Sequence, residues 1–126
     1  IGGLAPGIHQ GRVILDGSDD LAADDTASFT VEVGAPERVI VASAKPAART
    51  ARLMTEALAP VALRKAGTAR FTPEPVAIDA LDAVDWRNAA GIVLLDPPPL
   101  TERETEALVN WVSEGHGLVV WLGPAA

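Results

Sequence analysis

Apolar and polar residues alternate in two short stretches near the start of the chain. Residues 29–33 (FTVEV) place an apolar side chain at every second position, and residues 12–15 (RVIL) are a second strand candidate. A polar loop with many turn residues, 16–25, lies between them. The pattern predicts a β-hairpin within residues 1–35, with the three apolar residues of the second strand on one face. Because a lone hairpin is marginal in water, we expect this face to pack on another β-module, on the rest of the chain or on a second copy.

A different pattern begins after Pro36, where continuous apolar runs replace the strict alternation. Residues 38–43 (RVIVAS) are rich in β-branched side chains, which is typical of a strand buried on both faces. Apolar residues then recur at helical spacing over 47–58, which predicts a helix with Pro46 in its first turn and Pro60 as its stop. The two elements are the start of a strand–helix alternation.

The next apolar segment contains two prolines. Residues 71–78 favour an extended conformation, but Pro73 and Pro75 each lack the N–H that a sheet ladder requires. This composition predicts a strand at the edge of the sheet. Residues 79–86 are expected to form a short helix or a turn.

The clearest unit is a strand, a helix and a second strand near the end of the chain. Residues 91–96 (GIVLLD) predict a buried strand, and Thr101 with Glu104 forms a capping-box signature for the following helix. Gly115 suits a left-handed residue at the helix end, and residues 117–122 (GLVVWL) predict a third buried strand. So short a connection requires parallel pairing and a right-handed crossover. The apolar stripe of the helix consists of Leu108, Trp111 and Val112.

The residues of this unit also carry a resemblance. The run GIVLLDPPPLT, followed by LVNWVSEGHGLVVWLG, resembles the class I glutamine-amidotransferase-like fold in the form of its non-enzymatic relatives, such as the β-galactosidase trimerisation domain. Upstream, GIHQG, then DLAADD with Phe29, and then VIVA are similar to large bacterial membrane proteins of the aerotolerance (Bat) type. The implied fold is α/β, a flavodoxin-like or amidotransferase-like parallel sheet flanked by helices and preceded by a β-hairpin.

The resemblance also implies a cellular setting. In Bat-type proteins a double transmembrane segment and a von Willebrand factor A domain precede a β-rich stretch and an α/β layer, often near MoxR-type ATPase systems. It implies a membrane-tethered, extracytoplasmic module that is itself soluble and does not insert into the bilayer. The chain starts with Ile rather than Met, and we expect a piece of a longer protein. Residues 1–35 would be the tail of an upstream β-module and residues 36–126 a partial amidotransferase-like domain.

Composition and charge exclude several classes of function. The chain has 126 residues, the size of one ordinary domain, and a formal net charge of −7, without the basic footprint of a nucleic-acid binder. The absence of cysteine excludes disulfides, thiolate catalysis and thiolate-bound metals. Apolar runs such as 117–122 are far shorter than the roughly 20 residues of a membrane span.

Candidate binding residues follow from the predicted parallel sheet, because ligands gather beyond the carboxyl ends of its strands. Ser43, Asp96 and Gly123 occupy these positions, within 43–45, 96–99 and 123–124. Asp96 could hold a metal or a substrate hydroxyl, although a cap for the triple-proline loop is the favoured interpretation. Ser43 lacks the flanking glycines of a nucleophile elbow, so a loop or capping role is favoured.

No catalytic residue, metal site or cofactor is expected from the remaining side chains. The amidotransferase Cys is missing, and His116 is predicted at the end of its strand opposite to Asp96. His9 lies in the hairpin, so a site with both histidines would need chance geometry. The acidic loop 16–25 lacks the spacing of a calcium loop and favours a solvated turn.

The leading hypothesis is a non-catalytic structural or protein-interaction module of a larger membrane-associated bacterial protein. Its partners would be other proteins or the rest of its own chain, and a homodimer through the N-terminal hairpin is a further expectation. The alternative is a small-ligand binder, or a hydrolase or amidotransferase-like enzyme fragment whose catalytic residues lie outside this chain. A pocket bordered by Ser43, Asp96 and Gly123 would favour the ligand-binding alternative.

Overall fold

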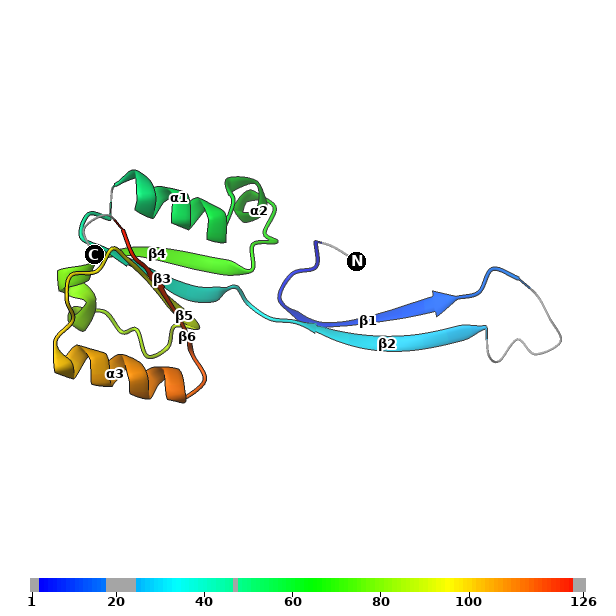
Figure 1. The fold of residues 1–126 in the computed structure, drawn as a ribbon. Helices are drawn as coiled ribbons and strands as arrows, with labels where there is room; N and C mark the ends of the chain where they lie inside the picture. The colour runs from blue at the N-terminus through cyan, green and yellow to red at the C-terminus, as the bar shows by residue number, and fades with distance from the viewer. Residues whose placement is uncertain (1–2, 18–24, 47, 124–126) are drawn as a thin grey trace. The chain divides into compact units, whose positions relative to one another are not determined.

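The computed structural model describes residues 3–17, 25–46 and 48–123. The chain forms two compact units, Ile1–Ala35 and Pro36–Ala126, and each has its own sheet (Figure 1). No helix in the described part is both long and apolar enough to cross a membrane.

The first unit is an antiparallel hairpin of β1 (Gly7–Ile14) and β2 (Thr26–Val33), paired from Gly7 with Val33 to Ile14 with Thr26. Both strands are longer than the sequence pattern predicted. Residues 7–11 contain two glycines and break the alternation, so pairing with β2 rather than propensity makes them a strand. Gly11 lies opposite Phe29, and a Cβ at Gly11 would come within 2.4 Å of the Phe29 ring. The ring therefore covers the glycine backbone.

The hairpin exposes most of its apolar side chains. Phe29, Val31 and Val33 share one face, as predicted, because they pair with alternate residues of β1. None of the described residues in this unit is buried, and four aliphatic side chains are more than half exposed: Ile8, Val13, Ile14 and Leu15. The expectation that this face packs on another surface stays a prediction.

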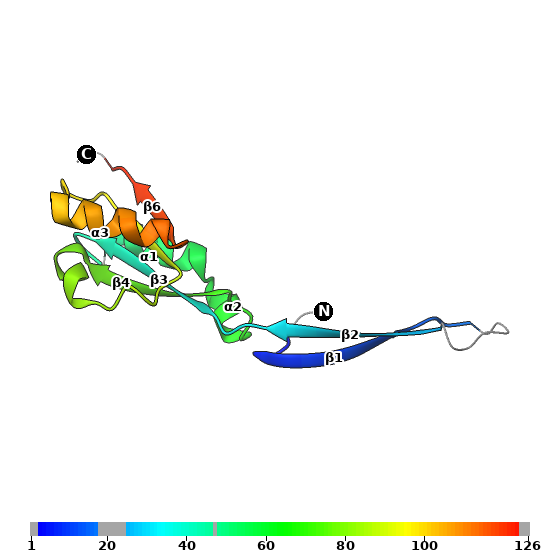
Figure 2. The ribbon, with the colours of Figure 1, turned by 90° about the horizontal axis from the view of Figure 1, so that it is seen from below.

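The second unit contains a parallel sheet in the order β4-β3-β5-β6, flanked by helices (Figures 1 and 2), which confirms the predicted α/β fold class. Its strands are β3 (Glu37–Ser43), β4 (Phe71–Ala77), β5 (Gly91–Leu95) and β6 (Gly117–Trp121). From β3 the chain first forms β4 on one side of it. It then forms β5 on the other side of β3, and β6 beyond β5. The point between β3 and β5, where this direction reverses, is the topological switch point at which doubly wound sheets bind ligands.

The helices lie on both faces of the sheet. α1 (Arg49–Leu58) and the short α2 (Val61–Lys65) connect β3 to β4 on one face (Figure 1), whereas α3 (Glu102–Ser113) connects β5 to β6 on the other. A 3₁₀ turn, η1 (Ile78–Ala83), follows β4 as predicted.

Pro46 differs from its predicted place in the first turn of the helix, whereas Pro60 follows the end of α1, as predicted for a stop. The helix starts after Ala48, so Pro46 lies outside it, and Pro60 is the residue that precedes the unpredicted α2. A proline suits either role, because its missing N–H both ends one helix and fits the start of the next.

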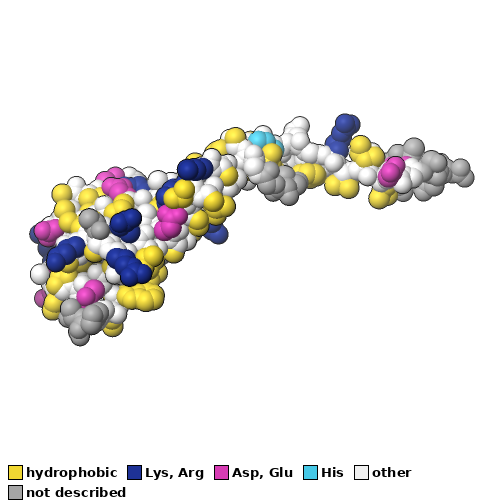
Figure 3. All heavy atoms as spheres, turned by 90° about the horizontal axis from the view of Figure 1, so that it is seen from above, with side chains coloured by type: hydrophobic (Ala, Val, Ile, Leu, Met, Phe, Trp, Pro, Cys, Tyr) yellow, Lys and Arg dark blue, Asp and Glu magenta, His cyan; other side chains and the backbone are white. Residues whose placement is uncertain are grey.

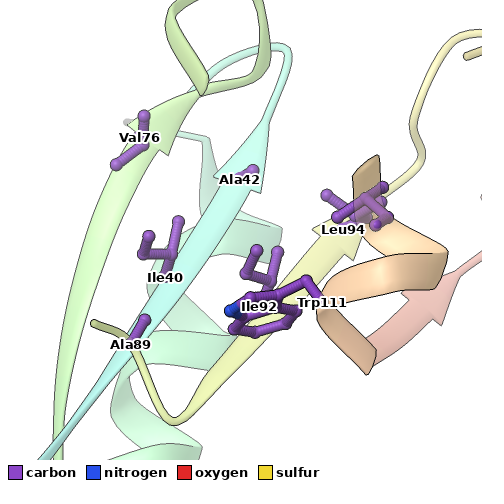
Figure 4. Packing of buried hydrophobic residues seen from close by; sticks show 8 residues of the cluster. Ile40, Ala42, Val76, Ala89, Ile92, Leu94 and Trp111 are labelled. Atoms are coloured by element: carbon purple, nitrogen blue, oxygen red, sulfur yellow. The ribbon is translucent and has the colours of Figure 1, made fainter. Parts of the chain in front are cut away.

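Two apolar clusters sandwich the central strands. Ile40, Ala42, Ile92 and Leu94 pack with Leu108 and Trp111 on the α3 face (Figure 4). Val39, Val41, Val93 and Leu95 pack with Ala51 on the α1 face. Successive residues of β3 and β5 thus enter opposite cores, which explains why both strands are continuously apolar, as predicted.

The last strand differs from its prediction as a buried strand. β6 lies at the edge of the sheet, and Val119, Val120 and Trp121 are 50, 47 and 58 % exposed. Leu118 packs against the core on the α3 face, but α1 lies over β3 and β4 rather than over β6. A continuous apolar run cannot distinguish a central strand from an uncovered edge strand, and this ambiguity explains the error.

The ends of α3 are built as the sequence predicts. Thr101 Oγ1 accepts a hydrogen bond from Glu104 N (3.3 Å), and Glu104 Oε2 accepts one from Thr101 N (2.7 Å). Hydrogen bonds from the Thr101 hydroxyl and backbone lower the pKa of Glu104. At the other end, Gly115 takes φ +101°, a conformation that L side chains rarely adopt.

Candidate functional site

The three candidate residues, Ser43, Asp96 and Gly123, line a single pocket of about 300 Å³. They follow or end β3, β5 and β6, so the pocket lies at the carboxyl ends of the strands and at the switch point between β3 and β5. The remaining lining residues are Ala44, Lys45, Ala48, Thr50, Ala51, Leu95 and Trp121.

Strand register brings these residues together. Ser43 pairs with Leu95, and Leu95 pairs with Trp121, so the three residues form a row across the sheet. The pairing of β5 with β6 extends one residue past the end of β5, because the Asp96 amide donates a hydrogen bond to the Trp121 carbonyl at 2.7 Å. Side chains in one row point to the same face, which here is the face that carries α1.

Ser43 is the one buried polar residue among the described side chains, with 6 % of its surface exposed. Its Oγ has no hydrogen-bond partner among the described residues. Since Val41 packs on the α1 face and side chains alternate along a strand, Ser43 also points toward that face, where the pocket lies. The capping role favoured for Ser43 has no support in this geometry.

Asp96 and Gly123 fix each other across the sheet. Asp96 has φ +49°, a left-handed conformation that Asp tolerates better than most residues. Its Oδ1 accepts a hydrogen bond from the Gly123 amide at 3.1 Å. A Cβ at position 123 would lie 2.5–2.8 Å from the carboxyl group of Asp96, so only glycine fits here without moving the carboxylate.

The start of α1 gives the pocket positive potential. The N-cap residue Ala48 makes no side-chain cap, and the first turn contains no acidic residue. The first helical N–H groups therefore keep their unpaired positive ends, and Lys45 lines the same pocket. The roles of Thr50 and of this helix start in lining the pocket were not predicted. The sequence contains a signal for the helix start, because no Ser, Thr, Asp or Asn stands at its N-cap.

Neither histidine lines this pocket. His116 stacks on Trp111 with ring centroids 4.5 Å apart, and His9 belongs to the first unit and bonds to the Ala5 carbonyl at 2.7 Å. Among the described residues, no three His, Cys, Asp or Glu side chains group as they would around a metal ion. Most of the acidic loop considered for calcium, 18–24, lies outside the described residues.

The outer side of β6 is a second candidate site. Gly117 donates to the Ala90 carbonyl at 3.1 Å and Trp121 accepts from Asp96, so the odd-numbered residues of β6 bond to β5. In a parallel ladder the residues between them point away, which directs the N–H and C=O groups of Leu118 and Val120 outward. No described strand pairs with this side.

Lys and Arg side chains and apolar patches alternate on the side of the α/β unit that carries α1 and α2 (Figure 3).

A comparison with known families, curated proteins and solved structures found no match to this chain. The site is therefore interpreted from its own geometry.

Proposed function

We propose that this chain is a non-catalytic protein-interaction module, in which β6 accepts an extended segment from a protein partner or from the rest of its own chain. The observation that supports it is the outer edge of β6, which presents the free backbone groups of Leu118 and Val120. The strand from Gly117 to Trp121 has no charged residue and no proline.

Such an edge is a template for strand addition. Exposed edge strands are normally protected by charge, proline, bulges or a covering element, because they otherwise recruit further strands. Recognition by strand addition combines main-chain hydrogen bonds with contacts to alternate side chains. On the α1 face, Val119 and Trp121 would supply those contacts, being half or more exposed.

The hairpin supports a second mode of assembly, a homodimer. Ile8, Val13, Ile14 and Leu15 are exposed on a two-stranded sheet, which is marginally stable alone. Val13 shares the face of Phe29 and Val31, and burying this face against a second hairpin would stabilise both. Light scattering over a concentration series should then show dimers that Val13→Lys abolishes and that Val109→Lys, at a 58 % exposed position of α3, does not. A monomer at every concentration would contradict this mode.

The cellular setting rests on the resemblance to Bat-type membrane proteins alone. We place the module in a membrane-tethered protein, on the extracytoplasmic side. Protease treatment of intact cells that express the full-length protein should cleave this region. Protection until the membrane is broken would contradict the placement.

A peptide-binding experiment tests strand addition at β6. The probe is a synthetic peptide with the sequence of residues 117–122 and solubilising lysines at both ends, added to the full 126-residue chain. Wild type should bind it, whereas Val120→Pro, which removes an outward N–H, should bind at least about tenfold more weakly. Equal binding by both proteins would contradict the proposal.

A further inference from the structure

The hydroxyl of Ser43 is buried in a residue that lines the pocket, and it has no hydrogen-bond partner among the described residues. A buried polar group without a partner destabilises a folded chain, and such groups are rare. Replacing Ser43 by alanine would remove this penalty without opening a hole, so packing does not require the hydroxyl. Its position in the wall of a 300 Å³ pocket is what a hydrogen bond to a bound molecule would explain.

The start of α1 suits the acidic group of such a molecule. The first described hydrogen bond of the helix runs from Arg52 to the Ala48 carbonyl, so the N–H groups of residues 49–51 have no helical partner. Free N–H groups at a helix start bind carboxylates and phosphates. Thr50 and Lys45 also line the pocket and add a hydroxyl and a positive charge.

Asp96 requires a donor on the same molecule. Gly123 occupies Oδ1, and Oδ2 accepts no hydrogen bond from a described residue. Because a ligand with negative charge alone would be repelled by this carboxylate, a hydroxyl or an ammonium group must face it. Ser43 pairs with Leu95, the residue before Asp96, so the acid and the donor of a small ligand can face these two residues together.

The rest of the pocket is apolar. Its apolar lining consists of Leu95, Trp121, Ala44, Ala48 and Ala51. Trp121 is 58 % exposed and would lose much of this exposure under a bound aliphatic group. The volume suits a molecule at the small end of the usual ligand range.

From these features we infer that the pocket binds a small carboxylic acid with an apolar side chain and a hydroxyl or amino group at carbon 2. The acid lies at the start of α1 with Ser43, Thr50 and Lys45, the substituent donates to Asp96, and the side chain lies on Trp121. Trp121 is shared with strand addition at β6, but the pocket rests on Ser43, the start of α1 and Asp96, so either proposal can fail without the other.

Four matched compounds test the chemistry by calorimetric titration of the full chain. They are leucine, 2-hydroxy-4-methylpentanoate, 4-methylpentanoate without the donor, and leucine amide without the acid. At least one of the first two should bind with a Kd of about 1 mM or tighter, and the last two at least about tenfold more weakly. The tighter of the first pair identifies ammonium or hydroxyl as the donor. Equal binding of all four, or binding of none, would overturn the inference.

Substitutions of pocket residues test whether the ligand binds in this pocket. Ser43→Ala should weaken the better ligand about tenfold or more while the melting temperature stays equal or rises, because a buried unpaired hydroxyl is removed. Ser113→Ala, which removes a hydroxyl bonded to Val109 on α3, is the matched control and should leave binding unchanged. Gly123→Ala should weaken binding by displacing the Asp96 carboxylate. Unchanged affinity in Ser43→Ala would overturn the assignment of the site.

Discussion

The two edges of the parallel sheet are built from different residues, although both strands are short and both pair with a buried neighbour. At β4 the even-numbered residues bond to β3, since Glu37 donates to the Arg70 carbonyl at 2.9 Å. Pro73 and Pro75 therefore occupy outward positions, where two potential donors are missing. At β6 the outward positions are Leu118 and Val120, which retain both donors.

Charge follows the same division. Glu74 of β4 forms an ion pair with Arg38 at 2.6 Å, and the arginine also donates to the Asp85 carbonyl. This ion pair raises the pKa of Arg38. β6 contains no charged side chain. The β4 edge thus has two of the features that prevent further pairing and the β6 edge has neither, which supports the proposal that the β6 edge serves for association.

The largest effect is expected from proline in β6, where neighbouring positions should differ. Val119→Pro removes an N–H that bonds to β5 and should lower the free energy of unfolding by about 1–3 kcal/mol. Val120→Pro removes an outward N–H and should cost much less, while it abolishes strand addition. Urea denaturation of both variants measures the difference, and equal destabilisation would contradict the assigned direction of the two N–H groups.

Opening the β4 edge is the converse experiment. Replacing Pro73 and Pro75 by valine restores two outward donors without a change in charge, and should create association that the wild-type edge prevents. Light scattering should show a mass that rises with concentration, and Val120→Pro should not reverse it. Unaltered mass in the double variant would show that the prolines do not protect this edge.

Removing the charge from β4 should have a smaller effect. Glu74→Gln breaks the ion pair with Arg38, whose side chains are 32 and 43 % exposed, so the loss of stability should be under about 1 kcal/mol. High salt should reduce the difference between wild type and variant. A difference that does not depend on salt would indicate that the charge plays no part at this edge.

The capping box of α3, the helix on the covered face of β6, should give the smallest effect and one that depends on pH. Because Thr101 lowers the pKa of Glu104 in the folded chain, its stabilisation is fully present above the ordinary value of 4.5. It is lost as pH falls through the lowered value. Melting temperatures of wild type and Glu104→Gln should therefore differ at neutral pH and converge in acid. Glu102→Gln, in the same helical turn but outside the capping box, should show a smaller difference.

Most of the α/β unit could be predicted from local signals in the sequence. Alternating entry of β3 and β5 into two cores produces continuous apolar runs, and Thr101, Glu104 and Gly115 mark the ends of α3 unambiguously. Pro73 and Pro75 identified an edge strand because the absence of an N–H is a property of the residue itself.

The exposure of β6 and the surroundings of Ser43 could not be predicted in this way. Val119 and Val93 are the same residue type on paired strands, yet one is 50 % exposed and the other 4 %. Only the position of α1, over β3 and β4, makes this difference. The candidates Ser43, Asp96 and Gly123 were found from the strand-end rule, but the unpaired hydroxyl depends on three-dimensional packing.

Amide hydrogen exchange of β6, measured residue by residue with and without the strand peptide, tests the central claim most directly. In the free chain, the amides of Leu118 and Val120 should exchange fast and that of Val119 slowly, because only the latter bonds to β5. Bound peptide should protect Leu118 and Val120 and leave the outward residues of β4 unchanged. Protection of Leu118 and Val120 in the absence of peptide at low concentration, or no protection on binding, would contradict the account of β6 as an open edge for strand addition.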